Sequence, residues 1–113
     1  MISEQLKRGT IELVLLAMLQ DGDKYGYQLV QELFAKSKGM YELQEGSMYP
    51  SLYRLQERGF ISTYEKVVCT KRRRVYYHLT EEGKVYLEKI VAEFRKITAG
   101  IELIFEGGVE NEE

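Results

Sequence analysis

The chain has 113 residues, 44% of them hydrophobic and 30% charged, which is the composition of one globular domain and excludes a disordered chain or a coiled-coil fibre. Its net charge is −2. No apolar run approaches the roughly 18 residues of a membrane span, and the first residues do not form a secretory signal, so we expect no membrane partner. The single cysteine, Cys69, excludes an internal disulfide framework and fits a reducing, cytoplasmic environment.

Two helices are predicted in the first third of the chain. The first runs from about residue 3 to residue 20, and its centre, residues 13–19, is the longest apolar run, which predicts a helix buried on all sides. Asp21-Gly22-Asp23 ends this helix, because aspartate and glycine favour turns. The second helix covers residues 25–34, where apolar side chains recur every four residues, and Lys38-Gly39 ends it.

A third helix is predicted from Ser47 to Arg58. Ser47 is expected to cap its N-terminus, and Pro50 then lies in the first turn, where its missing N–H costs nothing. Arg58-Gly59 provides the helix end, with a cation in the last turn and a glycine just beyond it. At 100° per residue, three apolar side chains share the face that is expected to pack on the first two helices: Met48, Leu52 and Leu55.

The opposite face of the third helix carries side chains suited to binding DNA. Tyrosine hydroxyls and arginine reach phosphates and base edges, and the free N–H groups of a helix N-terminus bind phosphate. The alternative is that Tyr49 and Tyr53 pack under a loop and that Arg54 is a solvated charge. The residues on this face are Tyr49, Pro50, Tyr53, Arg54 and Glu57.

Two strands are predicted next, over residues 60–68 and 75–79, because β-branched and aromatic side chains are frequent there. Residues 70–73 form the tip between them. Residues 48–78 carry seven Lys and Arg against two Glu, a balance of +5, so positive charge is concentrated here in an acidic chain. Such a hairpin would contact the DNA backbone or the minor groove, whereas the alternative is a solvated tip that only prevents edge-to-edge strand pairing. The four cations concerned are Lys71, Arg72, Arg73 and Arg74.

The last predicted element is a long helix that Thr80 caps and that extends to about Phe105. Gly107-Gly108 ends it, and residues 107–113 are expected to form an acidic, disordered tail. Six apolar side chains are spaced 3, 4, 3, 4 and 3 residues apart, which is the seam of paired helices. The first helix could cover this seam within the chain, but the second and third helices already need it, so a second copy of the chain is the expected cover. The seam residues are Leu87, Ile90, Phe94, Ile97, Ile101 and Ile104.

Three helices followed by a two-stranded hairpin form the winged variant of the helix-turn-helix fold, and three motifs add a family resemblance. Tyr25-Gly26-Tyr27-Gln28-Leu29 resembles the start of the second helix in the PadR family of bacterial transcriptional regulators. Residues 46–55 and 59–61, with Gly46-Ser47-Met48-Tyr49-Pro50 at their start, resemble its recognition helix. Residues 73–83 resemble its wing and the junction to the last helix, so that the likeness covers nearly residues 5–105.

The resemblance implies a mainly α-helical fold with a β-hairpin wing. It implies a winged helix-turn-helix DNA-binding domain over residues 1–79 and a C-terminal dimerisation helix over residues 80–106. The implied function is that of a homodimer that binds an inverted-repeat operator in double-stranded DNA, usually as a repressor released by a small molecule. The expected DNA contacts are Tyr25, Ser47, Tyr49, Pro50, Tyr53, Arg54, Lys71, Arg72, Arg73 and Arg74.

Two details qualify what the resemblance implies. A small aromatic or hydrophobic inducer would lie between the subunits, where Phe94 could stack on it, and ordinary interface packing of Phe94 is the alternative. Val68-Cys69-Thr70-Lys71-Arg72 stands where the family often has glycines or proline, so the wing tip is expected to be longer or differently bent.

No enzymatic activity and no cofactor are expected. One histidine, His78, and one cysteine do not form a zinc site with carboxylates at any recognisable spacing, and no phosphate-binding loop or nucleophile elbow is present. Cys69 beside four cations would suit oxidant sensing, and the alternative is an incidental small residue. A competing function is a winged-helix module that binds an acidic protein partner, and salt-dependent binding to DNA distinguishes the two.

Overall fold

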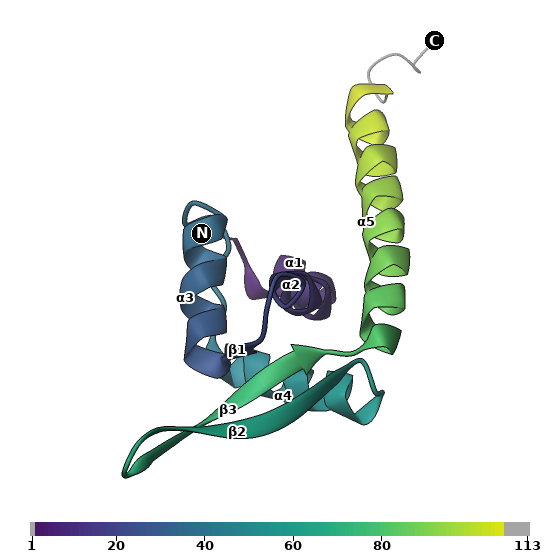
Figure 1. Ribbon diagram of the computed structural model, residues 1–113. Coiled ribbons are helices and arrows are strands. Elements are labelled where there is room, and N and C mark those ends of the chain that lie inside the picture. Colours follow the sequence, from purple (N-terminus) through teal and green to yellow (C-terminus); the bar gives the residue numbers. More distant parts are fainter. Residues whose placement is uncertain (1, 108–113) are drawn as a thin grey trace.

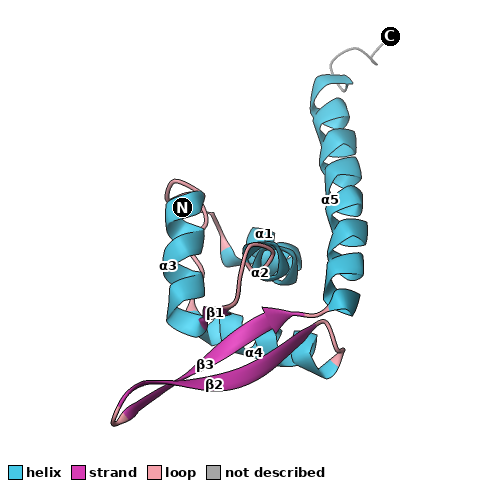
Figure 2. Ribbon diagram, viewed as in Figure 1, coloured by secondary structure: helices cyan, strands magenta, loops and turns pink. Residues whose placement is uncertain are grey.

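The computed structural model describes residues 2–107. Short helices enclose the core, a three-stranded antiparallel sheet lies against them, and one long helix projects from the body (Figure 1). The molecule measures 71 × 30 × 21 Å, because this helix and the hairpin extend in opposite directions. A mainly helical fold with a hairpin wing and a long C-terminal helix confirms the prediction from the sequence (Figure 2).

The N-terminal segment consists of three short elements, so the prediction of one helix over residues 3–20 is wrong. Side-chain hydrogen bonds compete with the helical ladder at the interruption. The hydroxyl of Thr10 donates to the Lys7 carbonyl at 2.8 Å, and the buried ammonium of Lys7 donates to the carbonyl of Glu42. The elements are α1 (Glu4–Lys7), the 3-10 helix η1 (Arg8–Thr10) and α2 (Ile11–Met18).

The core lies between α2, α3 (Gly26–Lys36) and α4 (Glu45–Glu57). As predicted, one face of α4 is buried, because its apolar side chains recur at helical spacing and meet the apolar side chains of α2 and α3. The buried residues at this contact are Leu15, Leu16, Leu29, Met48, Leu52 and Leu55.

The start of α4 differs from the prediction. The backbone N–H of Met48 donates to the carbonyl of Gln44 at 2.9 Å, so the first turn closes on Gln44. Ser47 is therefore inside the helix rather than its N-cap, and Pro50 lies in the second turn rather than the first, so both predictions are wrong. The side chain of Gln44 makes no capping hydrogen bond, which is why no capping signal marks the true start. The predicted end is confirmed, since Gly59 takes the left-handed φ of 82° that favours glycine after a helix.

The sheet has the strand order β1-β3-β2, with β1 (Lys24–Tyr25), β2 (Ile61–Cys69) and β3 (Arg72–Leu79). A strand of two residues has no periodicity, so the sequence did not predict β1. The hairpin turns at Thr70-Lys71, which places Arg72 and Arg73 in β3 and corrects the predicted four-residue tip. The hairpin also has a register shift between Val67 and Cys69.

The long helix α5 (Glu81–Gly107) begins at the predicted cap, because the N–H of Gly83 donates to the hydroxyl of Thr80 at 3.0 Å. It includes Gly107, so the predicted tail begins at least one residue too early, and residues 108–113 lie outside the described residues. Within residues 2–107, no helix is long and apolar enough to cross a membrane.

Candidate nucleic-acid interface

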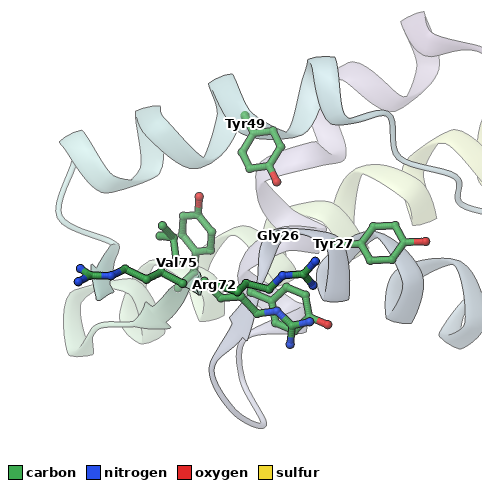
Figure 3. A pocket seen from close by; sticks show the side chains of 9 residues that line it. Gly26, Tyr27, Tyr49, Arg72 and Val75 are labelled. Carbon is green, nitrogen blue, oxygen red and sulfur yellow. The ribbon is translucent and has the colours of Figure 1, made fainter. Parts of the chain in front are cut away.

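One pocket joins the N-terminus of α3, the side of α4 and the edge of β3 (Figure 3). β1 pairs with β3 only at Tyr76 and Tyr77. On this side of β3, the residues from Arg72 to Val75 therefore have no pairing with β1. The pocket holds about 430 Å³. We call it the Tyr–Arg pocket; its lining residues are Tyr25, Gly26, Tyr27, Tyr49, Arg72, Arg73, Arg74, Val75 and Tyr77.

Tyr49 forms the α4 side of the Tyr–Arg pocket. Its ring points from α4 toward the space beside the start of α3 (Figure 3). A Cβ on Gly26 would lie 2.3 Å from the Tyr49 hydroxyl, so the ring occupies its position only because residue 26 has no side chain. Burial, and to a lesser extent the charge of Glu45, raise the pKa of Tyr49 above its usual value. Tyrosine is already protonated near neutral pH and this shift keeps it so, which leaves the hydroxyl able to donate a hydrogen bond to a ligand.

Two arginines of β3 make contacts with neighbouring side chains. The guanidinium of Arg74 lies 4.1 Å from the ring centroid of Tyr25, and a ring-stacked guanidinium keeps its N–H groups free for a ligand at its edge. Nη1 of Arg73 lies 3.1 Å from Oε1 of Glu65 on the neighbouring strand. No carboxylate is among the residues lining the Tyr–Arg pocket in the described chain, so its charge suits an anion such as a DNA phosphate.

The other predicted contacts lie outside this pocket. Nε of Arg54 lies 3.4 Å from Oε2 of Glu12, and its Nη2 donates to Ser51 at 3.0 Å, so Arg54 is turned toward α2 rather than directly outward. Ser47, Pro50 and Arg54 instead line a groove on the opposite flank of α4. Tyr53 is 63% exposed, and Lys71 lies in the hairpin turn. The structure therefore unites Tyr25, Tyr49 and the three arginines of β3, but not the whole predicted set.

Several residues at these surfaces were not predicted. Tyr27 belongs to the Tyr-Gly-Tyr motif, and its position beside Tyr25 could have indicated it. Gly26, Val75 and Tyr77 enter the pocket only through the packing of α3 and α4 on the sheet. Arg8 lines the second groove together with Arg54, and no pattern in the sequence connects these two residues.

The predicted seam on α5 divides into two parts. Leu87 is 2% exposed in the core of the same chain, so the prediction that a partner covers it is wrong. The reason is that α2 packs on the first turns of α5. Ile90 is partly buried against that core and also lines a groove with Phe94 and Ile97, so its contact with a partner stays a prediction. Phe94 and Ile97 line this groove of about 310 Å³ beside Gly9 and Leu13. The remaining seam residues are exposed in the single chain: Phe94, Ile97, Ile101 and Ile104.

His78 and Cys69, the side chains suited to metal or redox chemistry, lie on different strands of the wing. Within residues 2–107, no group of three or more His, Cys, Asp or Glu could hold a metal ion. Nδ1 of His78 lies 2.8 Å from Oδ1 of Asp23, and the hydroxyl of Tyr64 donates to Oδ2 of the same carboxylate at 2.7 Å. The hydrogen bond from Tyr64 lowers the pKa of Asp23. Cys69 is exposed at the end of β2.

The sequence and the fold both match known regulators. Residues 15–89 match the transcriptional regulator PadR-like family. The transcriptional regulator Rv3488 of Mycobacterium tuberculosis is 33% identical over 83 residues, which are 74% of this chain and 74% of that protein. A transcriptional regulator from Clostridium thermocellum has a TM-score of 0.82 at 29% identity, over 90% of this chain and 96% of that one.

Bacillus subtilis PadR in complex with operator DNA has a TM-score of 0.68 at 24% identity, over 73% of this chain and 47% of that chain, so this likeness concerns the fold. The family and these relatives are transcriptional regulators, which agrees with the prediction that the chain is not an enzyme. Since the family match covers residues 15–89 and the fold agrees over 90% of the chain, the protein belongs to the PadR-like family of transcriptional regulators.

Proposed function

We propose that the protein is a homodimer that binds an inverted-repeat operator in double-stranded DNA, represses transcription and is released by a small molecule. The observation that carries the DNA-binding part is the Tyr–Arg pocket, in which Arg72, Arg73 and Arg74 of the wing meet tyrosines of α3 and α4. Bacillus subtilis PadR, which shares the fold, has been solved with operator DNA, and this supports a DNA ligand for the same architecture.

In this proposal α4 enters the major groove and the wing follows the backbone beside it. Tyr49 and Tyr53 are exposed on α4 and would approach base edges, which carry the sequence information in the major groove. The arginines of β3 and the N-terminus of α3 would bind phosphates, which give affinity without sequence preference. Such a division of roles is usual for winged helix-turn-helix proteins.

The second copy of the chain would cover the exposed part of the α5 seam. Four large apolar side chains on one face of a helix are unfavourable in water, and pairing with the same face of another copy would bury them. A two-fold symmetric dimer presents two copies of α4, which matches two half-sites of an inverted repeat. The residues concerned are Phe94, Ile97, Ile101 and Ile104.

The inducer would bind in the groove between α2 and α5. Phe94 lines this groove and offers a ring on which an aromatic or hydrophobic compound would stack. A ligand there would lie against the dimer surface, so it would favour one arrangement of the two copies over another. We place the protein in the cytoplasm, together with the DNA that it would regulate.

DNA titrations at several salt concentrations test the proposal. The double variant Arg73→Ala, Arg74→Ala should bind every duplex about 10-fold to 100-fold more weakly and should reduce the slope of log K against log salt by about 1 to 2. Tyr49→Ala should lose mainly the preference for the operator. Arg95→Ala, Lys96→Ala, which removes two exposed cations from α5, is the matched control and should bind like the wild type. Unchanged DNA affinity in both site variants would refute the proposal and favour the acidic-protein partner.

A further inference from the structure

A cluster of side chains joins the end of α4 to the start of α5. The guanidinium of Arg58 lies 4.9 Å from the ring centroid of Phe60 and 5.0 Å from that of Tyr86. These two rings stack in parallel, with centroids 4.1 Å apart and an interplanar angle of 7°. Nη1 of Arg58 also lies 3.4 Å from Oε1 of Glu12 on α2. We call Glu12, Arg58, Phe60 and Tyr86 the α4–α5 elbow.

The backbone fixes the same two helices at this point. The N–H of Thr80 donates to the Phe60 carbonyl at 3.1 Å, and the hydroxyl of Thr80 donates to the Gly59 carbonyl at 2.7 Å. A Cβ on Gly83 would lie 2.0 Å from the Phe60 carbonyl oxygen, so the first turn of α5 touches the segment that follows α4. The start of α5 therefore has a fixed position on the end of α4.

Glu12 connects the elbow to a second turn of α4. One of its carboxylate oxygens lies 3.4 Å from Arg58, and the other lies 3.4 Å from Nε of Arg54. Both arginines are about half exposed, and exposed ion pairs contribute little to stability. The ion pairs of Glu12 therefore add only a small orienting effect on α4 against α2, and the parallel stack of Phe60 and Tyr86 beside Arg58 is the stronger contact of the elbow.

The length of α5 amplifies any change at its base. Its 27 residues span about 40 Å at 1.5 Å per residue. A rotation of about 5° at the elbow would move the far end by about 3.5 Å, which is roughly the rise of one base pair. Tyr86 and Glu12 also line the groove that contains Phe94 and Ile97, so the elbow lies at the base of the exposed seam.

We propose that the α4–α5 elbow sets the angle between α4 and α5 and thereby the spacing of the two half-sites that a dimer reads. In this proposal Glu12, Arg58 and Tyr86 are positioning residues and do not contact DNA. The inference rests on the proposed function, because it takes α4 to read DNA and α5 to join the two copies.

Operators of altered spacing test this role. The probe is a duplex that wild-type protein selects from a random-sequence pool. Wild-type protein, Tyr86→Leu and Glu12→Gln are titrated with this duplex, with one half of it, and with versions lengthened or shortened by one base pair at the centre. Both variants should bind the half-site within about 3-fold of wild type. Tyr86→Leu should lose about 10-fold of the preference for the native spacing because it removes the stacked ring, and Glu12→Gln should lose about 2-fold to 3-fold because its ion pairs are exposed. Val85→Ala, next to Tyr86 but exposed, is the control and should keep this preference. An equal loss of affinity at every spacing would indicate a merely structural role and overturn the inference.

A distance measurement without DNA tests the geometry directly. Spin labels are placed on α4 and α5 by Glu57→Cys and Glu102→Cys in a Cys69→Ser background, and the labelled chain is diluted with unlabelled chain. Tyr86→Leu should broaden or shift the distance distribution between the labels, and Val85→Ala should not. If the label-to-label distance distribution is unchanged in both Tyr86→Leu and Glu12→Gln, the elbow does not set the angle between α4 and α5, and the inference is refuted. Wild-type protein that binds no duplex overturns the proposed function instead, so the two failures are distinguishable.

Discussion

At the scale of single residues, two glycines have different reasons to lack a side chain. A Cβ at Gly26 would meet the hydroxyl of Tyr49, which is the end of a side chain that can rotate. A Cβ at Gly83 would meet the backbone carbonyl oxygen of Phe60 at 2.0 Å, and backbone cannot move without shifting α5. The first glycine therefore determines the shape of the Tyr–Arg pocket, and the second determines how α5 leaves the body.

Alanine substitutions separate these two roles. Gly83→Ala should lower the free energy of unfolding by about 2 kcal/mol or more, because the added methyl group would clash with the Phe60 carbonyl and no side-chain rotation can remove the clash. Gly26→Ala should change stability by less than about 1 kcal/mol but weaken operator binding about 10-fold, because Tyr49 must leave its position. Denaturant unfolding at one protein concentration and DNA titration give the two readouts. Gly46→Ala, where a Cβ would have no neighbour within 4 Å, is the control for stability. Equal stability of Gly26→Ala and Gly83→Ala would contradict this account.

At the scale of elements, one carboxylate connects the strands of the wing to the segment before β1. Asp23 accepts a hydrogen bond from Tyr64 of β2 and lies against His78 of β3. The rings of Tyr25 and Tyr64 both pack on Tyr76, with centroids 5.6 Å away in each case. Because β1 has two residues, these side-chain contacts rather than a long ladder hold it to the sheet.

The Asp23 contact predicts an acid-dependent contribution to stability. Tyr64 lowers the pKa of Asp23 in the folded protein from the ordinary 3.8, so the folded state favours the carboxylate. The contribution is therefore complete well above pH 3.8 and disappears as the pH falls through the lowered value. Tyr64→Phe should melt below wild type at pH 7, and the difference should shrink below pH 3.8.

Thermal unfolding from pH 7 to pH 3 checks this behaviour. The control is Tyr53→Phe, which removes an exposed tyrosine hydroxyl from α4 and should give a difference that does not depend on pH. A Tyr64→Phe difference that stays constant over the whole range would show that the hydrogen bond to Asp23 has no linkage to protonation.

At the scale of the whole molecule, the single chain leaves apolar surface uncovered. The first turns of α5 pack on α2, and beyond them the helix extends from the body (Figure 1). Ile101 and Ile104 are exposed there on the seam face, whereas Leu103 is exposed away from it at helical spacing. A dimer through this face would bury the seam and leave Leu103 at the surface.

Glutamate substitutions on the two faces test the dimer. Ile101→Glu would place a charge in the interface and should raise the dimer Kd by at least about 30-fold, equivalent to about 2 kcal/mol. Leu103→Glu makes the same kind of change on the other face of the same turn and should leave the Kd within about 3-fold. Sedimentation equilibrium over a range of concentrations measures both. Equal effects of the two substitutions, or a wild type that is monomeric at micromolar concentration, would refute the seam dimer.

The order of the main elements and the buried faces of the helices could be predicted from the sequence. Met48, Leu52 and Leu55 are buried and Thr80 caps α5 as predicted, because helical periodicity and capping depend on residues close together in the chain. Three short motifs carry the resemblance to the PadR family, and the family match over residues 15–89 confirmed it. The misplaced start of α4 follows from a cap without a side-chain hydrogen bond.

Which residues form the site depends on how the helices and strands pack together. The Tyr–Arg pocket unites Tyr25 and Tyr49 with residues 72–75, and the elbow unites Glu12 with Arg58 and Tyr86, in each case across dozens of residues of chain. Helical periodicity places Arg54 on the outward face of α4, but its contact with Glu12 turns the side chain toward α2. The physical reason is that periodicity assigns a side chain to a face of its own helix, whereas contacts between elements depend on how those elements pack.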